Sequence, residues 1–112
     1  MMQWDDTMST KEEVMSKLDT VEDPELHLSI VELGLVYDVR FEQKEGKHHA
    51  EIDITLTSPG CPAAPEIMAA AHRAALQAEG VESVHINLVW SPRWDPKIHA
   101  SEDAKMDMGI WD

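Results

Sequence analysis

The stretch Leu56-Thr57-Ser58-Pro59-Gly60-Cys61-Pro62 divides a segment with a two-residue hydrophobic period from an alanine-rich segment. Before it, apolar and polar residues alternate, which predicts a strand that ends at about Thr57. After it, residues 63–79 are nearly all strong helix formers, which predicts a helix. Two prolines and one glycine fix a sharp turn between the two elements. The fold must therefore contain a strand-to-helix junction here, with the only cysteine at the start of the helix.

The hydrophobic pattern of the whole chain predicts a small mixed fold in the order α-β-β-α-β-α. The expected elements are a helix over residues 10–20, a helical turn over 29–34, a strand hairpin over 35–42 and 48–57, the helix over 63–79, a strand over 84–91 and a short helix over 101–108. A right-handed crossover through the alanine-rich helix makes the second and third strands parallel. We therefore predict an α/β (α+β) fold, a small two-layer sandwich with helices mainly on one face of a three-stranded mixed sheet.

The length of the chain allows one hydrophobic core. With 112 residues and 43% hydrophobic composition, the chain is large enough for one compact domain but too small for two. Residues 1–8 show no clear hydrophobic period and are expected to form a flexible N-terminal tail. Residues 9–112 are expected to form the single domain.

Charge and composition argue against several kinds of partner. There are 22 acidic and 9 basic residues, and a net charge of −13 repels nucleic acid and anionic lipid surfaces. A single cysteine forms neither an internal disulfide nor a paired-cysteine metal site. No signal segment is visible, and no apolar run approaches the ~20 residues of a membrane span. The expected location is the cytoplasm.

The thiol of Cys61 is the first candidate for a functional group. The partial positive charge at a helix N-terminus favours the thiolate, although free cysteines are also common as small buried apolar residues. Thr57 and Thr55 share one face of the preceding strand, where threonine is also simply a good strand residue. Asp23 is displaced from the helical region by Pro24 and is expected on a loop, either as a turn residue or as part of a site.

The histidines do not show the spacing of a zinc site. The chain contains six of them, at positions 27, 48, 49, 72, 85 and 99. No two are separated by one or by three residues, and the adjacent pair on the predicted strand points to opposite faces. We therefore expect surface histidines rather than a closed zinc site.

Four motifs together resemble the SufT/PaaD-like family of iron–sulfur cluster assembly domains. They are Asp23-Pro24-Glu25, residues 29–37, residues 55–62, and the tail from Leu88-Val89-Trp90 to Ser101-Glu102-Asp103-Ala104-Lys105. The resemblance implies a small cytosolic α/β domain, often dimeric, that helps deliver or mature iron–sulfur clusters. It also implies a site of Cys61, Asp23, Thr57 and Thr55, in which Cys61 and Asp23 hold iron or an iron–sulfur cluster transiently. The family's tail usually reads Trp-Asp-Pro-Pro-Trp, whereas this chain has Trp90-Ser91-Pro92-Arg93-Trp94.

Three function classes remain open. The first is a maturation factor that works with iron–sulfur assembly proteins and client apo-proteins, handling clusters transiently because one cysteine cannot supply four thiolates. The second is a thiol enzyme with Cys61 as nucleophile, which is less favoured because no general base stands at a suitable spacing. The third is a non-catalytic adaptor that uses the acidic surface and the loop with Trp90 and Trp94. A homodimer is expected, since a second subunit could cover the sheet edges and Trp94.

Overall fold

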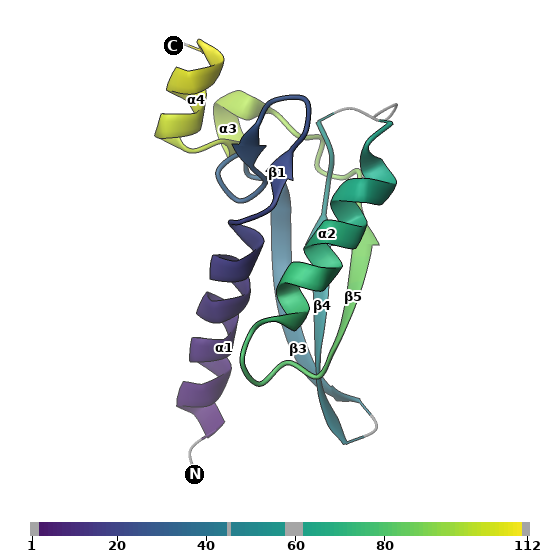
Figure 1. The fold of residues 1–112 in the computed structure, drawn as a ribbon. Helices are drawn as coiled ribbons and strands as arrows, with labels where there is room; N and C mark the ends of the chain where they lie inside the picture. The colour runs from purple at the N-terminus through teal and green to yellow at the C-terminus, as the bar shows by residue number, and fades with distance from the viewer. Residues whose placement is uncertain (1–2, 45, 58–61, 111–112) are drawn as a thin grey trace.

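The computed structural model describes residues 3–44, 46–57 and 62–110 and shows the two predicted layers (Figure 1). The longer elements are α1 (Gln3–Leu18), β3 (Val36–Lys44), β4 (Lys47–Ile54), α2 (Ala64–Leu76) and β5 (Ser83–Leu88). The shorter ones are β1 (Glu22–Asp23), β2 (Leu28–Ser29), α3 (Pro96–His99) and α4 (Glu102–Met108). In Figure 1, α1 and α2 lie together over one face of the sheet and leave the other face open. None of the helices in the described ranges is long and apolar enough to cross a membrane.

The three-stranded sheet is mixed, in the order β3-β4-β5. β3 and β4 form an antiparallel hairpin, and β4 pairs in parallel with β5 after the crossover through α2. At the centre of the sheet, Ile52 lies opposite Val39 of β3 and Ile86 of β5. The mixed sheet, its parallel pair and its helix-covered face confirm the predicted fold class.

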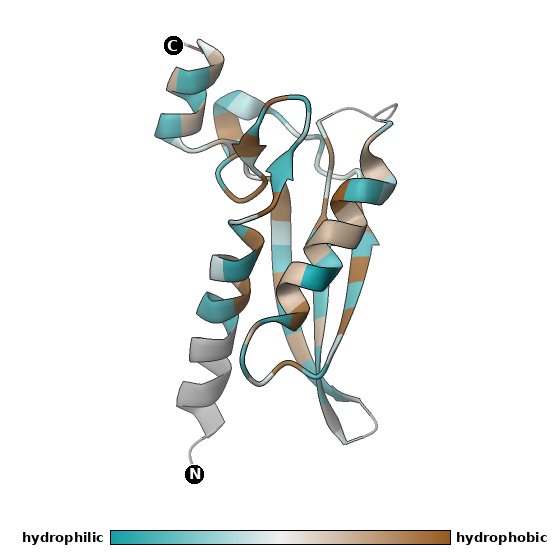
Figure 2. Cartoon of the chain, in the orientation of Figure 1, coloured by the Kyte–Doolittle hydropathy of each residue, from teal (hydrophilic) through white to brown (hydrophobic). Residues whose placement is uncertain are grey.

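The core lies between the sheet and the two long helices. Its fully buried side chains include Val14 and Leu18 of α1, Ile52 and Ile54 of β4, and Ile67, Ala71 and Ala75 of α2. Small alanine side chains let α2 approach the sheet closely. The alternating brown and teal segments along the strands in Figure 2 show the two-residue period that sends one set of side chains into this core.

Several element boundaries differ from the prediction. α1 begins at Gln3 instead of Thr10, so the helix also includes residues 3–8; this stretch contains no proline or glycine that would end a helix. α2 ends at Leu76, where Gln77 forms its C-cap. The sequence did not reveal β1, β2 or α3, because elements of two to four residues are too short to show a period.

The segment after β5 packs against the turn that precedes β3. Trp94 donates a hydrogen bond from Nε1 to the carbonyl oxygen of Leu33 at 2.7 Å, and its ring packs against the core. The Ser101 backbone N–H donates to the carbonyl oxygen of Glu32, also at 2.7 Å. Trp94 is therefore a packing residue and not the free apolar surface that was expected. Trp90, at 44% exposure, is the tryptophan on the surface of this segment.

The open face of the sheet carries polar side chains from all three strands. They are Asp38, Arg40 and Glu42 of β3, His49, Glu51 and Asp53 of β4, and Ser83, His85 and Asn87 of β5. Arg40 donates two hydrogen bonds to Asp53, at 2.7 and 3.1 Å, and one to Asp38, at 2.9 Å. The hydrogen bonds to Asp53 and Asp38 raise the pKa of Arg40, and the bond from Arg40 lowers the pKa of Asp53.

Glu51 lies at the centre of a second polar network on this face. Its Oε1 accepts a hydrogen bond from Asn87 at 2.9 Å and lies 3.1 Å from His85 Nδ1, while its Oε2 lies 2.6 Å from His49 Nε2. The hydrogen bonds from Asn87, His49 and His85 lower the pKa of Glu51 to about 2. At its other ring nitrogen, His49 lies 2.6 Å from the hydroxyl of Ser83.

This network predicts an acid-sensitive component of stability. The pKa of Glu51 is about 2 in the folded protein against an ordinary value of 4.5, so its contribution is complete above pH 4.5 and is lost as the pH falls towards 2. We expect urea midpoints measured across this range to fall more steeply for the wild type than for Glu51→Gln, which has no proton to take up. If the urea midpoints of the two proteins fall in parallel, Glu51 is not the source of the acid-sensitive stability.

Candidate functional site

Asp23 belongs to β1, and Thr55 and Thr57 follow β4, whose end lies towards the start of α2 (Figure 1). Three backbone hydrogen bonds, each of 2.9 Å, connect these segments. Thr55 N–H donates to Leu35, Leu35 N–H donates to Ile30, and Ile30 N–H donates to Val21. Asp23 follows Val21 by two residues in the chain. The fold therefore ties the end of β4 to the strand that carries Asp23.

Asp23 is a fully buried residue of β1, with 0% exposure, and this corrects the expectation that it lies on an exposed loop. Pairing of β1 with β2 covers it: Asp23 lies opposite Leu28. Its Oδ1 accepts hydrogen bonds from the backbone N–H groups of Glu25, at 2.7 Å, and Leu26, at 3.1 Å. Its Oδ2 is buried and has no hydrogen-bond partner among the described residues. Oδ1 thus stabilises the turn that follows Asp23, whereas Oδ2 forms no hydrogen bond within the described residues.

Thr55 is also buried, at 1% exposure. It lies just after the last residue of β4, and its Oγ1 has no hydrogen-bond partner among the described residues. Thr57, two residues on, is half-buried. Buried polar groups are nearly always hydrogen-bonded, so these two oxygens, which have no partner within the described part of the chain, call for an explanation.

Cys61 itself lies outside the described residues, as do residues 58–60, so the geometry of the predicted thiol stays a prediction. The structure resumes at Pro62, and α2 starts at Ala64 with Pro65 in its first turn. Ala63, the N-cap residue, provides no side-chain hydrogen bond to the helix start. The side chain of Ala63 therefore does not cap the backbone N–H groups of Ala64 and Glu66 at the helix start.

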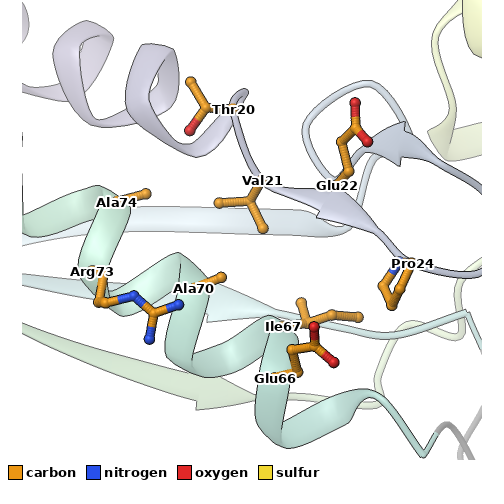
Figure 3. A pocket seen from close by; sticks show the side chains of 9 residues that line it. All are labelled: Thr20, Val21, Glu22, Pro24, Glu66, Ile67, Ala70, Arg73 and Ala74. Carbon is orange, nitrogen blue, oxygen red and sulfur yellow. The ribbon is translucent and has the colours of Figure 1, made fainter.

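A groove of about 270 Å³ runs between the segment of residues 20–24 and α2. Its lining residues are Thr20, Val21, Glu22, Pro24, Glu66, Ile67, Ala70, Arg73 and Ala74 (Figure 3). The lining combines apolar side chains with two carboxylates and one guanidinium. The sequence does not reveal this groove, because its walls come from segments more than forty residues apart that meet only in the folded protein.

The structure also brings together a group that the histidine spacing did not reveal. Potential metal-ligand atoms of Glu42, His49 and Glu51 all lie within 4.8 Å of one another. Glu42 and His49 are directly paired across β3 and β4, and Glu51 is two residues further along β4. The available signal was hairpin register, which places residues from two strands on one face, rather than any spacing along the chain.

This geometry defines a class of protein: a small α+β domain with a buried carboxyl group on β1 and a buried threonine just after β4. A family model described as "Iron-sulfur cluster assembly protein" matches residues 11–87, and the chain belongs to this family. The sequence resemblance to such assembly domains is thereby confirmed.

Similar proteins cover nearly the whole chain. It is 42% identical over 100 residues to the "Fe-S protein maturation auxiliary factor YitW" of Bacillus subtilis (strain 168), covering 89% of this chain and 94% of that protein. It is 40% identical to the "Fe-S protein maturation auxiliary factor SufT" of Staphylococcus aureus (strain USA300), covering 79% and 96%. A crystal structure of a domain of unknown function, DUF59, from Bacillus anthracis superposes with a TM-score of 0.82 at 34% identity, covering 93% and 95%.

Proposed function

We propose that this chain is an iron–sulfur protein maturation factor that holds iron or a cluster briefly and passes it to client apo-proteins. The observation that carries this proposal is the pair of buried oxygens, Asp23 Oδ2 and Thr55 Oγ1, without partners among the described residues. A buried polar atom without a partner costs free energy, typically ~1–3 kcal/mol. If iron or a cluster binds these oxygens for part of the time, their lack of a hydrogen-bond partner is explained. Membership of the family indicates this class of cargo.

The chemistry of the ligands supports brief binding rather than storage. A cysteine thiolate is a soft ligand that suits iron–sulfur clusters, and a carboxylate is a harder ligand that suits iron. In this proposal Cys61 supplies the thiolate, Asp23 supplies the carboxylate oxygen, and Thr55 and Thr57 supply hydroxyl groups. One thiolate per chain leaves most positions of a cluster for other donors, so the cargo is easily transferred.

Other proteins must then complete the site. The similar proteins of B. subtilis and S. aureus are named as maturation auxiliary factors, and we extend that role, with assembly proteins and client apo-proteins as partners, to this chain. A second copy could supply a second Cys61, so we also propose a homodimer in the cargo-bound state. A working thiol requires a reducing compartment, which makes the cytoplasm the proposed location.

The test compares the wild type with Cys61→Ser in two assays. Anaerobic incubation with ferrous iron and sulfide is expected to give thiolate-to-iron absorption and a dimer by light scattering in the wild type, and neither in the variant. In cells that lack the native protein, the wild type is expected to restore a client iron–sulfur enzyme and the variant is not. Thermal unfolding serves as the control for folding. Full client activity with Cys61→Ser would exclude this mechanism in favour of an adaptor.

A further inference from the structure

The group formed by Glu42, His49 and Glu51 lies on the open face of the sheet, away from the layer that contains Asp23 and α2. It combines one imidazole with two carboxylates from neighbouring strands. Glu42 is exposed, Glu51 is half-buried, and His49 is buried at 4% exposure. None of these residues belongs to the candidate site at the strand-to-helix junction.

Hydrogen bonds at both ring nitrogens fix the orientation of His49. Its Nδ1 lies 2.6 Å from the Ser83 hydroxyl, and its Nε2 lies 2.6 Å from Glu51 Oε2. Because the Glu51 carboxylate only accepts, Nε2 is the donor in the contact with Glu51. To bind a metal, Nε2 must give up this proton, and Nδ1–H then donates to Ser83 and holds the ring. Asn87 and His85 hold the second oxygen of Glu51, at 2.9 and 3.1 Å, so this carboxylate is also oriented before any ligand arrives.

The distances are compatible with one small cation. An ion ~2.1 Å from each nitrogen and oxygen donor in tetrahedral geometry keeps the donors roughly 3.4 Å apart. The contact of 2.6 Å between His49 and Glu51 would have to open by under ~1 Å. Glu42, whose ligand atom lies within 4.8 Å of the others, can move closer because its side chain is exposed. No change of backbone register is required, since the hairpin already places the three residues together.

We propose that Glu42, His49 and Glu51 form a binding site for a first-row divalent cation of the Zn²⁺ type. A set of one nitrogen and two oxygen donors suits zinc and its neighbours, whereas Mg²⁺ and Ca²⁺ prefer sites made of oxygen alone. With a neutral imidazole, two carboxylates bring two negative charges that a divalent cation neutralises. Three protein ligands leave one position of a tetrahedral site for water. The site is independent of Cys61 and of any cluster.

The experiment is a calorimetric titration of Zn²⁺ into the full chain that carries Cys61→Ser, so that the thiol does not contribute. One Zn²⁺ per chain is expected, together with a rise in the unfolding temperature. Adding Glu42→Gln is expected to weaken binding by ~10-fold or more, with the fold intact because Glu42 is exposed. Adding His49→Gln is expected to abolish binding. His48→Gln, at the adjacent exposed histidine, is the matched control and is expected to change nothing.

Further measurements separate a built site from scattered surface binding. With Co²⁺ as the probe, visible absorption typical of a tetrahedral site is expected with Glu42 and His49 present and absent in either variant. Ser83→Ala, which loosens the ring of His49, is expected to weaken Zn²⁺ binding while keeping one ion per chain. Millimolar Mg²⁺ is expected not to compete. Absence of binding, or equal Zn²⁺ affinity in the parent, Glu42→Gln and His49→Gln proteins, would overturn the proposal.

Discussion

Replacing Gly34 with alanine is expected to lower the free energy of unfolding by about 3 kcal/mol or more. Gly34 has φ of +77°, a conformation that side chains other than glycine's adopt only with strain. A Cβ atom at this position would also clash with the backbone oxygen of His99. Because that atom belongs to the backbone of α3, relief requires the C-terminal segment to move off the turn. Urea unfolding of the variant measures the loss.

Gly109 provides the matched control for this substitution. It has a similar φ of +75° at the end of α4, but a Cβ there would meet nothing within 4 Å. Gly109→Ala therefore isolates the cost of the left-handed backbone, which is ~1–2 kcal/mol. The difference between the two variants measures the close approach to His99. Equal losses would show that the contact between Gly34 and α3 contributes nothing to stability.

Asp23→Asn is expected to reduce client maturation nearly as much as Cys61→Ser while the protein stays folded. The amide can keep its oxygen at the position of Oδ1, where it accepts hydrogen bonds from Glu25 and Leu26. The atom that replaces Oδ2 becomes an uncharged amide nitrogen, which does not bind iron as a carboxylate oxygen does. Client enzyme activity in cells lacking the native protein gives the functional effect, and thermal unfolding verifies the fold.

Two further substitutions serve as controls for Asp23→Asn. Asp23→Ala removes both oxygens and leaves the N–H groups of Glu25 and Leu26 without their acceptor. We therefore expect this variant to lose client maturation and also ~1–3 kcal/mol of the free energy of unfolding. Thr55→Val replaces an unpartnered buried hydroxyl with a methyl group, so its stability is expected to stay equal or rise while client maturation falls. Normal client maturation with both Asp23→Asn and Thr55→Val would reduce these residues to structural roles.

Local and periodic features were determined by the sequence alone. The two-residue period in β3, β4 and β5 specified the sheet, since it allows only one face of each strand to be apolar. The alanine-rich stretch specified α2 and its close packing on the sheet. Gly109 ends α4 and Gly34 ends the turn before β3, each with positive φ as their positions predict. The four motifs together were enough to identify the family.

Only the tertiary structure decided which groups are buried and which meet across the fold. Asp23 was expected on an exposed loop, yet the short pairing of β1 with β2 buries it, and two-residue strands leave no period to read. Trp94 was expected at the surface, yet a hydrogen bond to Leu33, distant in sequence, holds it against the core. The grouping of Glu42 with His49 depends on hairpin register. Such contacts join residues far apart in the chain, and their energies depend on the packing of the whole fold. A local pattern of residues therefore does not predict them.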